Sequence, residues 1–299
     1  MKSILLAGLM VWTVSYVILW RLLARPQPEK GAQGREGGKK VSQFIPFAVT
    51  GAFTNFLDTL GIGSFATSIS IYKFWNLVPD ELLPGTLNVG HAIPVIVQAF
   101  IFIAVVKVQA LTLLTMIAAA VLGAWLGSGI VSRWKRRPIQ IGVGLALIAA
   151  AAAMLMGQMN LFPIGGQQLG VQGFRLVIAV IVNFALGAMQ ALGIGLYAPC
   201  MILVSLLGMN PRAAFPIMMG SCAFLMPVGG LRFIRGGAYH LRASLGLALG
   251  GIPGVLAAAY LVGSLPLRAV RWLVIAVVLY VAILMLRSAQ VSKGSKMQK

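Results

Sequence analysis

The tetrapeptide Leu60-Gly61-Ile62-Gly63 recurs 132 positions later as Leu192-Gly193-Ile194-Gly195. The same offset holds beyond it for three identical pairs: Ala66 with Ala198, Pro79 with Pro211, and Pro84 with Pro216. A tetrapeptide and two prolines in a single register are a strong sign of internal duplication. Residues from about 44 to 157 and from about 174 to 287 are therefore predicted to be two copies of one unit.

Composition sets the class of protein. Of 299 residues, 59% are hydrophobic and only 10% are charged, and several runs of about 20 residues carry almost no charge. A run of that length crosses a bilayer as a helix. The sequence lacks the short alternating strands of a transmembrane barrel. We therefore expect an all-α polytopic membrane protein, multi-pass in the cell (inner or plasma) membrane.

The charge is strongly basic, with 24 Lys+Arg against 5 Asp+Glu and a net charge of +19. Most of these basic residues lie in short connections between apolar runs, which is the positive-inside bias of a membrane protein rather than a nucleic-acid surface. No nucleic-acid partner is expected. Cys200 and Cys222 both lie in apolar segments and do not indicate a disulfide scaffold.

The chain divides into six parts. The apolar run Ile4 to Trp20 has no clear cleavage site after it and is predicted to be an uncleaved anchor helix. The next segment is rich in Pro, Gly, Lys and Arg and is predicted to be a flexible linker. The predicted parts are an N-terminal transmembrane anchor 1–24, a basic linker 25–43, repeat 1 at 44–157, an uncharged loop 158–173, repeat 2 at 174–287 and a basic C-terminal tail 288–299.

Each repeat has four apolar segments, and the basic loop from Arg133 to Arg137 constrains how they cross. If all three preceding segments of repeat 1 cross, this loop falls outside, opposite the basic linker. The second segment contains Pro84 and Pro94, and its partner in repeat 2 contains Pro216 and Pro227. Proline interrupts a helix, and Pro/Gly-interrupted segments at matching positions in two halves indicate a transporter's binding site.

Treating both second segments as re-entrant or broken gives three full crossings per repeat and repeats of opposite orientation. Arg232 and Arg235 then fall inside with the tail, whereas Lys73 and Lys107 fall outside. Arg212 also falls inside, and Arg268 falls outside. The rival interpretation is eight simple crossings in two parallel repeats.

A resemblance enters at residues 193–199, Gly-Ile-Gly-Leu-Tyr-Ala-Pro, and continues through Leu207-Gly208. Together with Leu265-Pro266-Leu267-Arg268 before an apolar helix, this pattern resembles the sulfite exporter TauE/SafE family of anion permeases. The resemblance covers about 44–287 and implies two related four-segment halves. The family's triple glycine is reduced here to Gly-x-Gly, and Thr67 stands where the second half has Pro199. The resemblance implies export or uptake of sulfite, sulfonates or related sulfur-containing anions, with no covalent chemistry.

Glycines that break a helix in mid-membrane expose backbone N–H groups, and helix N-termini bind anions. The hinges would be Gly61, Gly63, Gly193 and Gly195, and two such breaks are predicted to converge on one anion near the bilayer centre. The alternative is that these glycines only allow close helix packing. Candidate anion contacts are Asn55, Ser64 and Tyr197 beside the breaks, Asn88 on the first proline-containing segment and Arg232 at the end of the second; Thr59 and Asn183 also flank the breaks.

Asp58 lies inside an apolar segment just before the first break, and its repeat partner is Gln190. An ionisable residue within a membrane is a functional candidate by default, because a charge there is costly. Asp58 is predicted to couple transport to protons, with capping of the broken helix as the alternative. His91 is the second candidate for proton coupling, against a packed hydrogen-bonded side chain. Sodium coupling stays open as well.

The leading hypothesis is a secondary permease for a small sulfur-containing anion, without cofactor or metal. An ATP-driven pump is not indicated, because the chain has no Walker phosphate loop. An enzyme is not expected, because one Asp and the separated His91 and His240 make a poor catalytic set. The alternatives are a permease for another anion such as thiosulfate, or a membrane scaffold or assembly subunit that docks through the linker. The direction of transport and the oligomeric state are left open.

Overall fold

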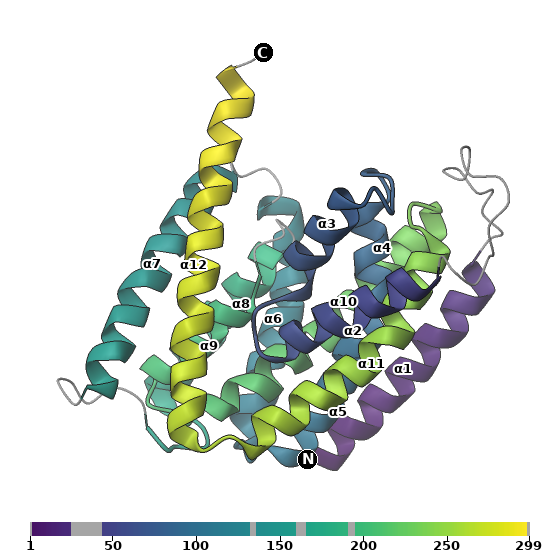
Figure 1. Ribbon diagram of the computed structural model, residues 1–299. Coiled ribbons are helices and arrows are strands. Elements are labelled where there is room, and N and C mark those ends of the chain that lie inside the picture. The colour runs from purple at the N-terminus through teal and green to yellow at the C-terminus, as the bar shows by residue number, and fades with distance from the viewer. Residues whose placement is uncertain (1, 25–43, 132–135, 160–165, 191–194, 298–299) are drawn as a thin grey trace, which may run out of the picture. The chain divides into compact units, whose positions relative to one another are not determined.

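The computed structural model describes residues 2–24, 44–131, 136–159, 166–190 and 195–297 (Figure 1). The predicted linker 25–43, Gly193 and most of the loop Arg133 to Arg137 lie outside these residues. In the described ranges all regular elements are helical. They are α1 (Lys2–Leu23), α2 (Phe44–Thr59), α3 (Ser64–Phe74), α4 (Leu83–Gly90), α5 (Ala92–Val105), α6 (Ala110–Val131), α7 (Arg136–Gln158), α8 (Gly173–Gln190), α9 (Tyr197–Leu206), the short 3₁₀ helix η1 (Pro211–Ala213), α10 (Ala214–Gly236), α11 (Leu241–Ser264) and α12 (Leu267–Met297).

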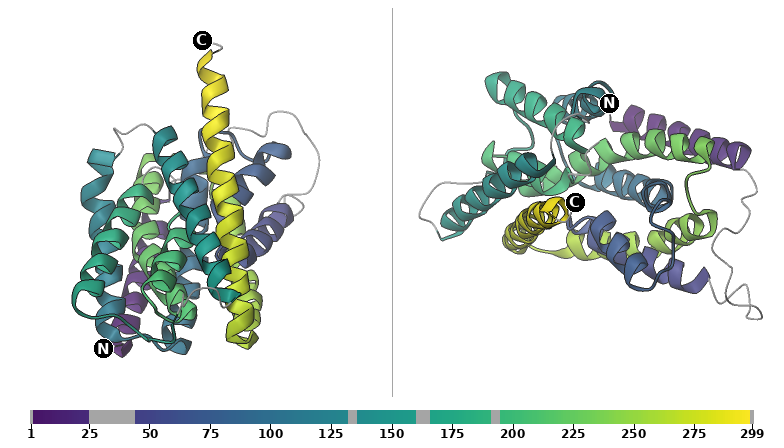
Figure 2. Two further views of the ribbon diagram at one scale, coloured as in Figure 1. Left: turned by 90° about the vertical axis from the view of Figure 1, so that its left-hand side faces the viewer. Right: turned by 90° about the horizontal axis from the view of Figure 1, so that it is seen from above.

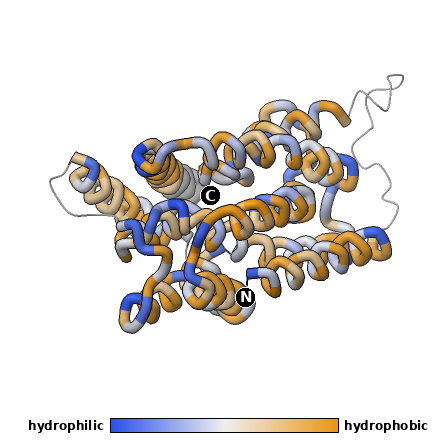
Figure 3. Tube along the Cα trace, turned by 90° about the horizontal axis from the view of Figure 1, so that it is seen from below, coloured by the Kyte–Doolittle hydropathy of each residue, from blue (hydrophilic) through white to orange (hydrophobic). Residues whose placement is uncertain are grey.

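Seven helical segments in the described ranges are long and apolar enough to cross a membrane. These are Lys2–Leu23, Leu83–Val105, Pro138–Gln158, Gly173–Gln190, Pro211–Gly236, Leu241–Ser264 and Leu267–Arg287. Figure 3 shows the pattern on α1, where apolar residues fill the length of the helix and hydrophilic residues stand at its two ends. The chain therefore has the architecture of a multi-pass helical membrane protein.

The two predicted repeats contain the same sequence of elements. Residues 44–157 hold α2, the short α3, the pair α4–α5, α6 and α7, and residues 174–287 hold α8, the short α9, the pair η1–α10, α11 and α12. The duplication itself stays a prediction.

The chain forms two compact units, and each unit contains residues from both predicted repeats. Unit 1 consists of Met1–Ala104 and Cys222–Gly263, and unit 2 consists of Val105–Ser221 and Ser264–Lys299. Unit 1 thus holds α1 to α5, most of α10 and α11. Unit 2 holds α6 to α9, all of α12 and the first residues of α10. Figure 2 shows its helices α7 and α12 side by side.

In unit 1, α2 and α3 form a hairpin that returns the chain to the end from which it came. Phe47 near the start of α2 stacks edge-on against Tyr72 near the end of α3, with ring centroids 5.8 Å apart. Phe47 also lies 5.7 Å from the ring of His240, which precedes α11. The tip of the hairpin is the short connection Leu60 to Gly63. The first apolar segment of repeat 1 therefore turns back, rather than running through.

This hairpin shows that the first segment turns back, and it fixes the end of unit 1 at which Lys73 lies. The proline-containing second segment, Leu83–Val105, is long enough to cross, with His91 the single residue between α4 and α5. Its partner α10 runs without interruption through Pro227. Lys73 and His240 line one pocket, so Lys73 belongs at the same end of unit 1 as the α10–α11 turn, contrary to the expected opposite sides. The apolar length of a segment does not reveal its direction, so the sequence could not show that these two residues share an end of the unit.

Unit 2 contains a second hairpin, formed by α8 and α9. The backbone N–H of Asn210, just after α9, donates to the carbonyl of Gln168, just before α8, at 2.9 Å. The start of α6 lies at the same end, because the N–H of Gln109 donates to the carbonyl of Leu169 at 2.7 Å. Residues 166–172 of the predicted uncharged loop are thus packed into this unit.

Each hairpin's first helix crosses a partner helix closely at small residues. In unit 1, a Cβ on Gly254 of α11 would lie 2.0 Å from the carbonyl oxygen of Ala52 on α2. In unit 2, a Cβ on Gly123 of α6 would lie 1.9 Å from the carbonyl oxygen of Phe184 on α8. Ala52 and Phe184 are 132 positions apart and Gly123 and Gly254 are 131 apart, the offsets at which the sequence copies align. Small residues at these crossings allow backbones to approach, as expected for helices in lipid.

The N-terminal helix α1 packs against other helices of unit 1. Tyr16 is buried, and its hydroxyl donates to the carbonyl of Val89 on α4 at 3.4 Å. Gly230 of α10 leaves room for the same hydroxyl, 2.9 Å from where its Cβ would stand. The anchor therefore contributes a buried face as well as a membrane span.

Candidate functional site

A buried polar face runs along α2. Thr50, Thr54, Asn55, Asp58 and Thr59 are all at most 5% exposed. The threonine hydroxyls donate back along the helix, from Thr54 to the carbonyl of Thr50 at 2.8 Å and from Thr59 to that of Asn55 at 2.7 Å. These hydroxyls donate within the helix, and Asn55, Asp58 and Thr59 are the side chains of this face that also bond to other elements.

Two glycines shape the hairpin tip after α2. The N–H of Gly61 donates to the carbonyl of Asp58 at 2.8 Å and the N–H of Ile62 donates to that of Leu57 at 3.1 Å. This pair of bonds is a Schellman motif, and Gly61 has the left-handed φ of 95° that the motif requires. Gly63 has φ 92° and ψ 137°, a combination that residues with a Cβ rarely adopt. The tip thus ends α2 and starts α3 within four residues.

The carboxylate of Asp58 is held across this tip. Its Oδ1 accepts the backbone N–H of Ser64, the first residue of α3, at 2.7 Å. Its Oδ2 accepts from Nε2 of Gln98 on α5 at 3.0 Å, and the same Nε2 lies 3.0 Å from Oγ1 of Thr59. Asp58 is 4% exposed and Gln98 is fully buried. The carboxylate therefore stands at the positive end of α3, inside the unit.

A second chain of hydrogen bonds passes through His91. Its Nδ1 lies 3.1 Å from Oδ1 of Asn55, and its Nε2 lies 3.0 Å from Oγ of Ser68 on α3. Nδ2 of Asn55 donates to the carbonyl of Gly51 at 2.8 Å, which leaves Oδ1 as the acceptor for His91. With that amide orientation Nδ1 carries a proton, and in a neutral ring Nε2 accepts from the Ser68 hydroxyl. His91 thus ties both helices of the hairpin to the α4–α5 junction.

We name these seven buried residues the hairpin network: Asn55, Asp58, Thr59, Ser64, Ser68, His91 and Gln98. The sequence had singled out Asn55, Asp58, Thr59, Ser64 and His91, and the structure brings them together in unit 1. It missed Gln98 and Ser68. Gln98 had a detectable signal, because it is the one polar side chain in the apolar run 92–104 and follows His91 by seven residues, two helical turns.

Equivalent positions in unit 2 carry less polarity. The predicted repeat alignment, at an offset of 132, pairs Asp58 with Gln190, Asn55 with Gly187 and Ser68 with Cys200. Tyr197 begins α9 and is 8% exposed. Gly195 lies two residues before it, and a Cβ there would meet no atom within 4 Å. Asn183 is fully buried, and its Nδ2 donates to the carbonyl of Met116 at 2.7 Å. Asp58 in unit 1 is therefore an acid whose predicted counterpart in unit 2, Gln190, is a neutral amide.

Comparison with protein-family models, with curated proteins and with solved structures found no match to this chain. The resemblance to a permease family accordingly rests on the quoted residues alone.

The remaining candidates lie outside the hairpin network. Asn88 is half-buried, its Nδ2 donates to the carbonyl of Pro84 at 2.8 Å, and its Oδ1 lies 3.3 Å from where a Cβ on Gly229 would stand. This places Asn88 at the contact between α4 and α10. Arg232 is exposed in the last part of α10. The structure does not bring either residue to the hairpin tip.

The chemistry open to the hairpin network is proton binding and anion binding. Among the described residues no group of His, Cys, Asp and Glu is arranged to hold a metal ion. Asp58 offers a carboxylate whose two oxygens already accept hydrogen bonds, and α3 offers its N-terminal N–H groups to a negative charge.

Proposed function

We propose that this protein is a secondary permease for a small anion, coupled to protons through Asp58. The proposal is carried by one observation, the buried Asp58 carboxylate bonded to the first N–H of α3 and to Gln98. Burial of a carboxylate in a membrane protein costs free energy, so such a residue is by default a candidate for a function. The Ser64 N–H and the Gln98 amide are neutral hydrogen-bond donors, so they stabilise the carboxylate without neutralising its charge.

The coupling follows from what a proton on Asp58 would change. Ionised, the carboxylate satisfies the positive end of α3 from within the chain. Protonated, it brings no charge to that end, and one of its oxygens becomes a donor. The N-terminus of α3 then attracts an external anion in its place. Proton and anion are therefore expected to bind together and to move in the same direction.

The substrate class is proposed from the resemblance to sulfite exporters. Sulfite and short sulfonates are small oxyanions that backbone N–H groups bind well. Thiosulfate, of the same size class, is the alternative substrate. Gly61 and Gly63 support this role by opening the backbone at the tip, and the equivalent Gly193 and Gly195 are proposed to do so in the second repeat. No covalent step and no cofactor are part of the proposal.

The proposed membrane path counts the two hairpins as re-entrant. Each repeat then crosses three times, by α4–α5, α6 and α7 and by α10, α11 and α12, and α1 adds a seventh crossing. Along this path Lys73, the loop Arg133 to Arg137, Arg232 and the C-terminal tail share the cytoplasmic side. Lys107, Arg212 and Arg268 lie on the opposite side. The basic excess on one side supports the path.

The test is flux into proteoliposomes of purified protein, with sulfite, thiosulfate and a short sulfonate compared against sulfate under an imposed pH gradient. Asp58→Asn keeps an oxygen to accept the Ser64 N–H but cannot lose a proton. We expect wild-type flux to follow the gradient and flux of the variant to fall at least tenfold and to ignore it. Glu81→Gln removes an exposed carboxylate and is the matched control.

Undiminished, gradient-driven flux in Asp58→Asn would reject Asp58 as the proton carrier and leave it a helix cap. No flux of any anion by the wild-type protein would favour the scaffold alternative. In that case deletion of residues 25–43 should abolish complex formation with partner proteins.

A further inference from the structure

A pocket opens in unit 1 at the far end of α3 from the hairpin tip. Its volume is about 490 Å³, within the range of roughly 300–1,000 Å³ that small-molecule sites occupy. Its lining comes from the end of α3, the α3–α4 connection and the α10–α11 turn: Lys73, Asn76, Leu77, Val78, Pro79, Asp80 and His240. None of these residues belongs to the hairpin network.

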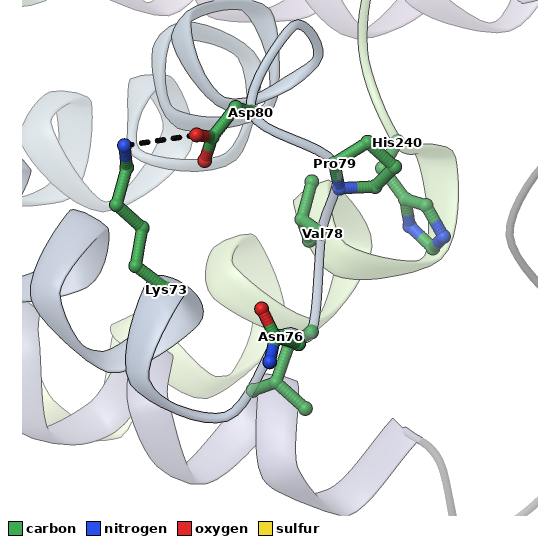
Figure 4. A pocket seen from close by; sticks show the side chains of 7 residues that line it. Lys73, Asn76, Val78, Pro79, Asp80 and His240 are labelled. Atoms are coloured by element: carbon green, nitrogen blue, oxygen red, sulfur yellow. Dashed lines mark hydrogen bonds and ion pairs between the residues drawn. The ribbon is translucent and has the colours of Figure 1, made fainter.

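The polar groups of this pocket face one space. In Figure 4 the side chains of Lys73, Asp80 and Asn76 border the same opening, and Val78 and Pro79 form its wall. Nζ of Lys73 lies 3.0 Å from Oδ2 of Asp80, but the two side chains are 53% and 69% exposed. An ion pair so exposed contributes little free energy, on the order of 0–1 kcal/mol. Another anion can therefore replace the Asp80 carboxylate as the partner of Lys73 at little cost in free energy.

Asn76 is held in an unusual conformation at the edge of this pocket. Among the described residues it is the one non-glycine residue with positive φ, at 48°. The cause is the end of α3: the N–H of Asn76 donates to the carbonyl of Lys73 at 3.3 Å and the N–H of Leu77 donates to that of Tyr72 at 2.9 Å, which is a Schellman motif with Asn76 at its left-handed position. In Figure 4 the amide oxygen of Asn76 faces the opening and the amide nitrogen points away from it. Rotation of the amide by half a turn would bring its two N–H donors to a ligand in this space.

The position of His240 fixes the other side of the pocket. Its backbone N–H donates to Oγ1 of Thr86 at 2.9 Å, and its Nδ1 accepts the N–H of Ala243 at 3.1 Å. The α10–α11 turn is thereby fastened to α4, so the pocket has a firm wall. In a neutral ring the proton then stands on Nε2, which is a donor.

The charge at this end of unit 1 favours an anion. Four basic side chains, Lys73, Arg232, Arg235 and Arg242, stand on α3, on the last part of α10 and at the start of α11, against the acidic Asp80 and Glu81. Clustered charge of one sign raises the local concentration of the opposite ion.

From these observations we infer that the pocket is a second anion-binding site, in which a small oxyanion displaces Asp80 from Lys73 and accepts hydrogen bonds from Asn76. Asp80 acts there as a tethered competitor of the ligand. The choice of a sulfur oxyanion as ligand rests on the proposed function, whereas the site itself does not.

The test compares substitutions of the two partners of the Lys73–Asp80 ion pair, which are expected to change the affinity for the anion in opposite directions. Binding of thiosulfate and sulfite to detergent-purified protein is measured by calorimetry, and KM for flux is measured in phosphatidylcholine proteoliposomes. Lys73→Gln should weaken binding and raise KM about 3- to 10-fold, whereas Asp80→Asn should lower KM about 2- to 5-fold. Asn76→Gly, which keeps the backbone conformation and removes the amide, should raise KM as well. Maximal flux should change less than twofold in all three.

Lys107→Gln, the same charge change at an exposed lysine outside the pocket, is the control and should leave KM unchanged. Equal effects of Lys73→Gln and Asp80→Asn would overturn the inference, because loss of a structural ion pair acts the same way from either partner. An effect that appears only when phosphatidylglycerol is added would overturn it in favour of a lipid headgroup. Absence of wild-type flux with the binding differences intact would reject the proposed function and keep the site.

Discussion

Single residues in this chain act through backbone conformation and through buried polarity. Gly61 and Gly63 carry φ values of 95° and 92° at the hairpin tip. Asp58 and His91 each join elements that are distant in sequence, to Gln98 across 40 positions and to Asn55 across 36. The glycines turn the chain, and the polar side chains hold it turned.

Gly63→Ala tests the conformational requirement by itself. A Cβ at Gly63 would meet no atom within 4 Å, so any cost comes from the positive φ. We expect a loss of about 1–2 kcal/mol in the free energy of unfolding, seen as a lower Tm of purified protein in detergent. Gly142→Ala is the control, since its Cβ would also be unobstructed but its backbone is helical. There alanine should be neutral or stabilising by about 0.5–1 kcal/mol. Equal Tm changes at both positions would contradict the argument.

Elements in each unit meet at crossings that require small residues. Gly254 of α11 presses against α2, as Gly123 of α6 presses against α8. These crossings place the first helix of one predicted repeat against the third apolar segment of the other. They fix how α2 lies in unit 1, and through α2 the position of the hairpin network.

Gly254→Ala should separate α2 from α11. Its Cβ would stand 2.0 Å from the carbonyl oxygen of Ala52, a backbone atom that cannot turn aside. Overpacking of this kind costs typically about 1–3 kcal/mol or more. The expected result is a lower Tm and less monodisperse protein in fluorescence-detected gel filtration. Gly263→Ala, on the same helix with no atom near its Cβ, should behave as wild type. Wild-type behaviour of Gly254→Ala would show that the crossing is not this close.

On the scale of the whole molecule, the path of the chain decides which charges share a side of the membrane. The hairpin α2–α3 returns to the end at which α10 meets α11, since Phe47 contacts both Tyr72 and His240. The helix Leu83–Val105 then leads away from that end.

Cysteine labelling in intact cells tests this path. The buried Cys200 and Cys222 are first replaced by alanine. Lys73→Cys and Arg235→Cys should then react only when the cytoplasmic face is opened, and Lys107→Cys should react with an impermeant reagent from outside. Labelling of Lys73→Cys from outside would restore the path in which the second segment turns back.

Hydropathy and local pattern were sufficient for several features. They predicted a multi-pass helical protein, and most described spans lie where apolar runs occur, because a helix satisfies its own backbone within a local segment. They also singled out Gly61, Gly63 and Asp58, since glycine pairs and a lone carboxylate stand out in an apolar run. The repeats and the anion remain predictions from the same pattern.

Only the tertiary structure decided which segment turns back and which side chains meet. An apolar run of given length is compatible with crossing, with turning back and with packing as an anchor, so the sequence could not show that Lys73 lies at the same end of unit 1 as the α10–α11 turn. Gln98 and Ser68 joined the site through contacts across 40 and 23 positions. The sequence by itself determined helices and their apolar surfaces, because these depend on neighbours along the chain. The direction of the helices and the buried hydrogen bonds were decided by packing, because they depend on residues that are neighbours only in space.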